Sequence, residues 1–285
     1  MHDYGFTCAK KTNQRNGTVC NDPALGRCIR CAGEQYGVAK AAVLAGGLSW
    51  SRRRHAGVAR FLAISGSIAE AFTLNGGVDP EKVLLVPSFV PDDAADSAAG
   101  TTRPAFLPVE DGYLMFAGAL GRHKGVDVLL AAHRSMRTRV PLVLIGTTRQ
   151  DTADVLAQAG PDVLVATNVP HPDVMYAWRH AALAVVPSVW EEPFGLVAVE
   201  AMLAGTPVIA SATGGLNDVV ADDETGVFVP PGNVVALTTA IDDLLREPDR
   251  MRRLAAAAVV RGWRFTASVV VPQIEAVYDE VLAHP

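Results

Sequence analysis

The sequence lacks a hydrophobic run long enough to cross a bilayer. Its longest weakly charged stretch, Val38 to Ser51, contains Lys40 and is shorter than the roughly 20 apolar residues that a spanning helix needs. A secretory signal is also missing at the start, where His2 and Asp3 follow Met1 directly. We therefore expect a cytoplasmic protein, with peripheral contact with the inner face of the membrane as the alternative.

Aromatic residues are scarce, at 6% of the chain, and they are not interleaved with the basic residues. The absence of such an arrangement argues against a surface that stacks nucleic-acid bases, so we expect no nucleic-acid partner. The net charge of −5 is unevenly divided, because residues 1 to 60 carry a balance of +7. This basic part would suit an anionic acceptor or a membrane surface, or it is an ordinary solvated face.

The chain shows neither a Ser–His–Asp pattern nor a Walker lysine motif. What it does have is 49% hydrophobic residues with 25 Gly and 18 Pro, as in a turn-rich α/β protein. From Tyr113 onward, short apolar runs alternate regularly with helical patterns. That alternation predicts a doubly wound parallel sheet. Before it, we expect helices over 36–47, 49–60 and 65–75, and strands over 61–64 and 83–86.

Cysteine is limited to the N-terminal segment, which is poor in apolar periodicity. The four cysteines are Cys8, Cys20, Cys28 and Cys31. A C-x-x-C pair with two upstream cysteines can supply four thiolates to a structural zinc ion. Reduced structural thiols and redox chemistry are the alternatives, since disulfides are disfavoured in a reducing cytoplasm.

The most informative stretch runs from residue 183 to residue 210. An apolar run at 183–187 reads as a buried strand, Pro193, Phe194 and Gly195 open a helix, and a second strand starts at Val208. Strand, turn, helix and strand in this order form a parallel βαβ unit. Its turn lies at the carboxyl edge of the sheet, where open α/β sheets bind ligands.

Two carboxylates lie at this turn. Glu192 comes just before the helix and Glu200 two turns into it. A helix N-terminus attracts phosphate, and a carboxylate on a largely apolar helix needs hydroxyl donors such as those of a ribose. The alternative is a capping Glu192 and a solvent-exposed Glu200.

Two further stretches suggest the same kind of ligand. Gly118 ends a strand and precedes Lys124-Gly125, which together offer a close backbone approach and a positive charge to phosphate. Gly214-Gly215 leads to Asp218 in a turn that enters a helix. Each stretch could also be an ordinary surface turn.

The stretch E-P-F-G-L-x-x-x-E after P-S resembles the E-x7-E signature of the retaining family 4 (group 1) glycosyltransferases, which have the GT-B fold. The resemblance implies that Glu192 and the backbone at Phe194, Gly195 and Leu196 hold the donor sugar, and that Glu200 holds the nucleotide ribose. It also places Gly214 and Gly215 beside the donor. Asp218, whose side chain is shorter, stands where the family pattern G-G-x-x-E has glutamate.

The stretch around Gly118 resembles the family pattern G-R-L-x-x-x-K-G, in which both cations hold the diphosphate. Lys124 matches, whereas Ala119 replaces the arginine, and Arg122 could supply the second cation from three residues later. His2-Asp3 resembles the family's H-D motif, which makes His2 the active-site histidine. Ser88 stands where the family has asparagine.

The resemblance implies three parts, of which the first is incomplete, because the chain begins at the H-D motif. Residues 1–105 would form a partial N-terminal, acceptor-side domain with the Cys-rich segment 8–31 and a linker at 92–105. Residues 106–265 would form a complete nucleotide-sugar-binding domain, and 266–285 a helix that returns to the first.

The implied reaction transfers sugar from a nucleoside diphosphate sugar to an unknown acceptor, a glycan, a lipid-linked molecule or a small molecule, with retention of configuration. Catalytic roles would fall to Lys124, Glu192, His2 and Arg122, and no cofactor is required for catalysis. The alternatives are a non-catalytic nucleotide-sugar-binding partner or truncated paralogue, and a nucleotide-sugar epimerase on the same fold.

Overall fold

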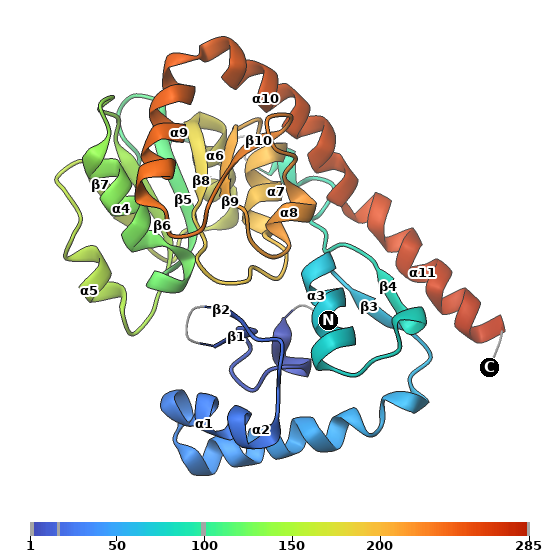
Figure 1. The fold of residues 1–285 in the computed structure, drawn as a ribbon. Coiled ribbons are helices and arrows are strands. Elements are labelled where there is room, and N and C mark those ends of the chain that lie inside the picture. Colours follow the sequence, from blue (N-terminus) through green and yellow to red (C-terminus); the bar gives the residue numbers. More distant parts are fainter. Residues whose placement is uncertain (1–2, 16–17, 98–100, 284–285) are drawn as a thin grey trace.

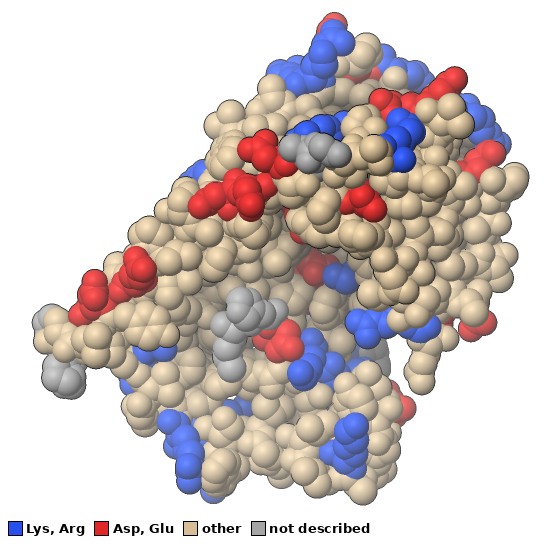
Figure 2. Space-filling view, turned by 180° about the vertical axis from the view of Figure 1, so that it is seen from behind, with Lys and Arg blue, Asp and Glu red and all other residues tan. Residues whose placement is uncertain are grey.

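The computed structural model describes residues 3–15, 18–97 and 101–283. It has two lobes, and Figure 1 shows the larger, C-terminal one built around a single sheet with helices on both faces. The smaller lobe contains the N-terminal helices and, among the described residues, two short pairs of strands. A hollow separates the lobes on the face shown in Figure 2.

The sheet of the larger lobe confirms the parallel, doubly wound arrangement that the alternation of elements predicted. Its six strands pair in parallel in the order β10-β9-β8-β5-β6-β7. They are β5 (Tyr113–Leu120), β6 (Leu142–Thr148), β7 (Val163–Ala166), β8 (Ala181–Val186), β9 (Val208–Ser211) and β10 (Gly226–Val229). The chain passes from β5 to one edge and then from β8 to the other. The loops after the neighbouring strands β5 and β8 therefore lead in opposite directions along the sheet. The place between them is a topological switch point, where such sheets bind ligands.

The strands are apolar on both faces because helices cover both. In β5, Leu114 and Phe116 belong to one buried cluster, whereas Met115 and Ala117 belong to the other. The helices of this lobe are α4 (Val126–Ser135), α5 (Thr152–Leu156), α6 (His171–His180), α7 (Leu196–Leu203), α8 (Leu216–Val219), α9 (Val234–Arg246) and α10 (Pro248–Gly262). Helices α4 and α9 pack on one face and α6 and α7 on the other (Figure 1).

The smaller lobe has a modest core, which includes Tyr4, Phe61, Ile68 and Phe72. Its elements are β1 (Gln14–Arg15), β2 (Thr18–Val19), α1 (Leu25–Tyr36), α2 (Val38–Arg52), β3 (Phe61–Ala63), α3 (Gly66–Glu70), a π-helical turn (Ala71–Asn75) and β4 (Val83–Leu85). Strands β1 and β2 are antiparallel, and β3 and β4 are parallel. Ser65 caps α3 as expected, because its hydroxyl accepts the N–H of Ile68 at 3.3 Å.

The helices expected over 36–47 and 49–60 are wrong in their bounds. A single helix, α2, continues through Gly46 and Gly47, and the sequence analysis did not predict α1. Ala32 is the one fully buried side chain of α1 among the described residues, and the partly buried Cys28, Ile29 and Tyr36 lie on the same face of the helix. Gly37, with φ of 81°, separates α1 from α2.

The last helix, α11 (Ala267–Ala283), runs beside β3 and β4 of the smaller lobe (Figure 1). It is fastened near its start, where the N–H of Ser268 donates to Asp92 at 2.9 Å, and near its end, where Arg60 pairs with Glu280. None of the helices in the described ranges combines the length and the apolarity needed to cross a bilayer. On the face shown in Figure 2, the Lys and Arg side chains of the smaller lobe are separated by uncharged surface.

Candidate functional site

The loops that follow β5 and β8 are packed together so closely that one contact requires glycine. Gly125 has φ of 70°, and a Cβ there would stand 1.9 Å from the carbonyl oxygen of Pro187. Beside this contact the N–H of Val189 donates to the carbonyl of His123 at 3.1 Å. The approach carries Lys124, at the end of the first loop, to the residues that follow β8.

Lys124 and Glu192 form an ion pair where these loops meet. The Nζ atom of Lys124 lies 2.8 Å from Oε1 and 2.7 Å from Oε2 of Glu192. The Lys124 side chain is 21% exposed and that of Glu192 is 9% exposed. Two neutral donors hold the same carboxylate, because Ser188 Oγ and Trp190 Nε1 lie 2.9 and 3.0 Å from Oε2. Two residues that were predicted for the site separately are thus in direct contact.

Trp190 contributes more than a hydrogen bond. The Lys124 Nζ lies 5.1 Å from the centroid of its ring, and the edge of the His123 ring lies against it. Burial, and then the charges of Lys124 and Arg149, lower the pKa of His123, which favours its neutral form. The sequence analysis singled out neither Trp190 nor His123, and the only local signal was their closeness to Glu192 and Lys124 along the chain.

Gly214 and Gly215 allow another backbone segment to approach Glu192. A Cβ on Gly214 would stand 2.2 Å from the Glu192 carbonyl oxygen, and one on Gly215 would stand 2.6 Å from Phe194 Cα. The N–H of Gly215 donates to that Glu192 carbonyl at 2.6 Å. Gly195 starts α7 with φ of 102°, and a Cβ there would meet Leu216 at 2.5 Å. These glycines fix the path of the backbone around Glu192.

The ion pair faces a cleft of about 350 Å³ between the lobes. The cleft is lined by Asp3, Ile64 and Ser88 from one lobe and by Lys124, Trp190, Glu192, Pro193, Phe194, Gly195, Leu196 and Val197 from the other. The first residues of α7 therefore border it, and a helix start presents N–H groups without intrahelical partners. Asp3 of the H-D motif reaches the cleft, whereas His2 lies outside the described residues.

Glu200 has a different partner, which the sequence analysis missed. Its Oε1 lies 3.1 Å from Nε2 of His171, the first residue of α6. The Glu200 side chain is 17% exposed, and the hydrogen bond to it raises the pKa of His171. The two glutamates of the motif thus have separate surroundings, Glu192 before α7 and Glu200 in the second turn of that helix.

Arg122 and Asp218 each have a partner outside the Lys124–Glu192 pair. Arg122 Nη1 lies 3.4 Å from Asp127 Oδ2, and its side chain is 54% exposed. Asp218 accepts the N–H of Gly66, in the other lobe, at 2.8 Å. Gly118, with φ of 146°, lies at a close approach of two strands, since a Cβ on Gly146 would overlap its carbonyl.

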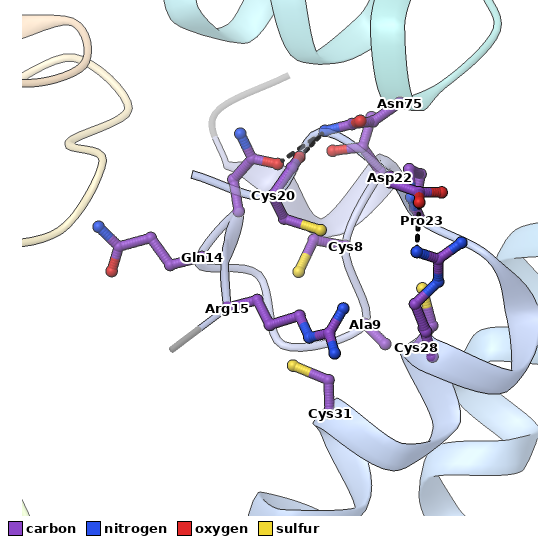
Figure 3. Close-up of a pocket in the computed structure, with 13 residues that line it drawn as sticks. Cys8, Ala9, Gln14, Arg15, Cys20, Asp22, Pro23, Cys28, Cys31 and Asn75 are labelled. Carbon is purple, nitrogen blue, oxygen red and sulfur yellow. Dashed lines mark hydrogen bonds and ion pairs between the residues drawn. The ribbon is translucent and has the colours of Figure 1, made fainter. Parts of the chain in front are cut away.

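The four cysteines, all partly buried, line one small pocket of about 30 Å³ in the smaller lobe (Figure 3). Burial raises the pKa of the Cys28 thiol, and the neighbouring Cys20 raises it further. As the side chains stand, the described residues contain no group of three or more His, Cys, Asp or Glu arranged to hold a metal ion.

Comparison with known proteins gives the site a family context. Residues 102–260 match the family model "Glycosyl transferases group 1". Curated relatives include the D-inositol 3-phosphate glycosyltransferases of Xylanimonas cellulosilytica and Catenulispora acidiphila. The first is 35% identical over 66% of this chain and 49% of its own length, and the second is 33% identical over 78% and 55%. The chain thus spans about half the length of the curated relatives that it matches.

Solved structures with the GT-B fold are also similar. Sucrose-phosphate synthase from Thermosynechococcus elongatus superposes with a TM-score of 0.69 at 26% identity, over 85% of this chain and 72% of its own. Anabaena HepE in complex with UDP and glucose gives 0.70 at 19% identity, over 90% and 81%. The likeness to HepE shows the fold alone.

Proposed function

We propose, from the premise that this chain belongs to the group 1 glycosyl transferases, that it transfers a sugar from a nucleoside diphosphate sugar to an acceptor with retention of configuration. The observation that carries the proposal is the Lys124–Glu192 pair, which faces the cleft between the lobes at the switch point of the sheet. The pair combines a cation for phosphate with a carboxylate for sugar hydroxyls.

In this proposal the diphosphate lies between Lys124 and the start of α7. The N–H groups at that helix start and the ammonium group both favour an anion. Lys124 has to give up part of its contact with Glu192 when the diphosphate binds. The Glu192 carboxylate is not left unpaired by this exchange, because the Ser188 hydroxyl and the Trp190 indole N–H still donate to it.

Glu192 then accepts hydrogen bonds from hydroxyls of the donor sugar. A carboxylate offers about four lone-pair sites, and the three side chains around Glu192 leave room for a ligand donor once Lys124 turns to phosphate. Glu200 is assigned to the ribose hydroxyls. His171, its present partner, then yields the carboxylate to the ribose or shares it.

The reaction breaks the bond between the sugar C1 and the phosphate oxygen, and forms a bond from C1 to the acceptor oxygen on the same face. The acceptor's proton passes to the leaving phosphate. As that bond breaks, negative charge gathers on the diphosphate, and Lys124 with the α7 start stabilises it. Neither Glu192 nor Glu200 acts as a nucleophile in this scheme.

The acceptor would enter from the side of the smaller lobe, which contributes Asp3, Ile64 and Ser88 to the cleft. A lipid-linked acceptor would bring this lobe, with its excess of basic residues, to a membrane surface. A glycan or a small molecule would need no such contact.

A second function, nucleotide-sugar binding without transfer, is favoured by one feature. Ala119 stands where the family pattern has arginine, and Arg122 pairs with Asp127. The diphosphate would then have one side-chain cation where the family pattern has two. This arrangement would weaken catalysis more than binding, because the charge to be stabilised is largest in the transition state.

One assay of the purified protein distinguishes these functions. Donor binding is measured by calorimetry for UDP, GDP and ADP and for their sugar conjugates, and sugar release and transfer are followed by NMR, which reports the anomeric configuration. Transfer with retention supports the first proposal, and binding without release supports the second. An inverted product, or epimerisation of the free donor, contradicts both.

A further inference from the structure

The four cysteines come from separate stretches of chain and meet at one place. Cys8 and Cys20 belong to the irregular segment before α1, whereas Cys28 and Cys31 lie one turn apart on α1 itself. All four line the same pocket, and Figure 3 shows them surrounding it. The fold thus brings together the two halves of the C-x11-C and C-x-x-C pattern, which sequence spacing alone could not establish.

The segment that carries Cys8 and Cys20 has almost no hydrophobic core of its own. Among its described residues from 7 to 24, the buried side chains are Thr7 and Asn13, and both are polar. Where the structure describes this segment, its regular structure is limited to strands β1 and β2 of two residues each. A segment that buries so little apolar surface would gain stability from a cross-link or a metal.

The charges around the pocket are those that a cluster of thiolates requires. Arg15 and Arg27 line it, although Arg27 pairs with Asp22 of the same lining, and Arg52 reaches the segment from α2. Arg52 donates to the carbonyls of Thr7 at 3.1 Å and Pro23 at 3.4 Å, so its charge is fixed in place. Four thiolates around one Zn²⁺ carry a net charge of −2, which Arg15 and Arg52 would offset.

We propose that Cys8, Cys20, Cys28 and Cys31 bind one structural zinc ion as a four-thiolate site. Each thiol loses its proton to solvent as it binds, and the sulfurs come to about 2.3 Å from the metal in tetrahedral geometry. In their present rotamers no three of them are arranged to do so, and binding therefore requires rotation about their Cα–Cβ bonds. Partial burial leaves these side chains room to rotate.

The zinc site would also support the cleft between the lobes. Gln14, which lines the cysteine pocket, donates from Nε2 to the carbonyl of Val189 at 3.3 Å. Val189 precedes Trp190, which holds Glu192. Asn75 fastens the same segment by donating to the Cys20 carbonyl at 2.6 Å. A zinc ion that orders the segment would therefore order one contact of the loop after β8.

The test is elemental analysis of the 285-residue protein, purified under reducing conditions and dialysed exhaustively. We expect about one zinc per chain, released in proportion when a mercurial reagent modifies the thiols. The variants Cys28→Ser and Cys31→Ser should lose the metal. Asp22→Asn is the control, because Asp22 lines the pocket but is not a proposed ligand, and this variant should keep its zinc.

If the serine variants fail to fold, measurements on the unmodified protein still test the proposal. Metal-free reduced protein whose melting temperature does not change when zinc is added would contradict it. So would a mass showing disulfides among these cysteines in freshly isolated protein, or zinc that survives modification of all four thiols.

Discussion

The ammonium group of Lys124 lies within 2.8 Å of both carboxylate oxygens of Glu192, across 68 residues of sequence. The contact exists because Gly125 lets the loop after β5 approach the end of β8. In a site this sheltered, each charge keeps the other from being buried alone. A ligand that engages either residue must therefore offer the other a substitute partner, and a diphosphate sugar offers both.

Lys124→Ala is expected to weaken binding of a nucleoside diphosphate by roughly ten- to a hundredfold, since a hydrogen bond to a charged group contributes about 1.5–3 kcal/mol. Binding of the nucleoside without phosphate should change little. Calorimetry with both ligands measures the difference. Arg122→Ala is the matched control, because Arg122 is directed toward Asp127, and its effect should be small. Equal weakening of both ligands by Lys124→Ala would contradict the phosphate assignment.

Trp190→Phe is expected to slow transfer about tenfold while leaving stability nearly unchanged. The substitution keeps a ring beneath Lys124 but removes the indole N–H that donates to Glu192 at 3.0 Å. Steady-state kinetics should show a lower kcat with a smaller change in donor KM. Trp50→Phe, at an exposed position on α2, serves as the control. Kinetics identical to those of the unmodified protein would remove Trp190 from the site.

The sequence predicted the central βαβ unit well because its signals are local. Apolar runs mark the strands, Gly195 opens the helix and Gly205 follows its end, so no distant contact was needed. The sequence could not show that His171 pairs with Glu200, because a lone histidine at a helix start carries no pattern. The pairing of Arg122 with Asp127 could not be predicted either, because the partner of a long flexible side chain is determined only by the folded structure.

The missed helix α1 has a related cause. Helix prediction from sequence relies on an apolar stripe, and the inward face of α1 is built largely of small residues such as Cys28 and Ala32, which make that stripe weak in the sequence. Its stabilising contacts are those with α2 and the cysteine segment, which come from tertiary structure.

Nucleotide affinity is expected to rise with pH through the range in which His171 titrates. Its hydrogen bond to Glu200 raises the pKa of His171 above the ordinary value of 6.5. In the free protein that bond stabilises the fold fully below about pH 6.5, and its contribution is lost as pH rises through the raised pKa. A ribose that takes Glu200 competes with the protonated imidazole, so binding should release a fraction of a proton.

Calorimetry in buffers of different ionisation enthalpy measures that proton release. His171→Gln cannot titrate, and its nucleotide affinity should be independent of pH over the same range. Glu200→Gln should weaken nucleotide binding at every pH and abolish the release. Proton release that persists in His171→Gln would show that another group is responsible.

Gly125→Ala is expected to destabilise the protein by more than about 2 kcal/mol. A positive φ alone costs an L-residue roughly 1–2 kcal/mol, and the added methyl group would stand 1.9 Å from a backbone oxygen that cannot move without β8. Gly46→Ala is the control: nothing lies within 4 Å of a Cβ there, and Ala in a helix interior should stabilise slightly. Urea denaturation compares the two, and equal midpoints would contradict the packing described here.

Asp218 joins the lobes, and its removal is expected to let the cleft open. Its carboxylate accepts the N–H of Gly66, one of the donors at the start of α3 that lack an intrahelical partner. Arg261 fixes the segment behind it by donating to the carbonyls of Asp218 and Val219 at 2.7 and 2.6 Å. Because Arg261 holds the backbone at Asp218, substitution of the Asp218 side chain should remove the contact with Gly66 without moving this backbone segment.

Asp218→Ala should accordingly increase the radius of gyration of the ligand-free protein and raise the donor KM more than it lowers kcat. Asp218→Asn keeps an oxygen that can accept from Gly66, and it should behave almost like the unmodified protein. Small-angle scattering with and without nucleotide, together with kinetics, distinguishes the two variants. If Asp218→Ala leaves both the scattering and the KM unchanged, the contact does not control the distance between the lobes, and the other interlobe contacts, such as that of Gln14 with Val189, are sufficient to hold them.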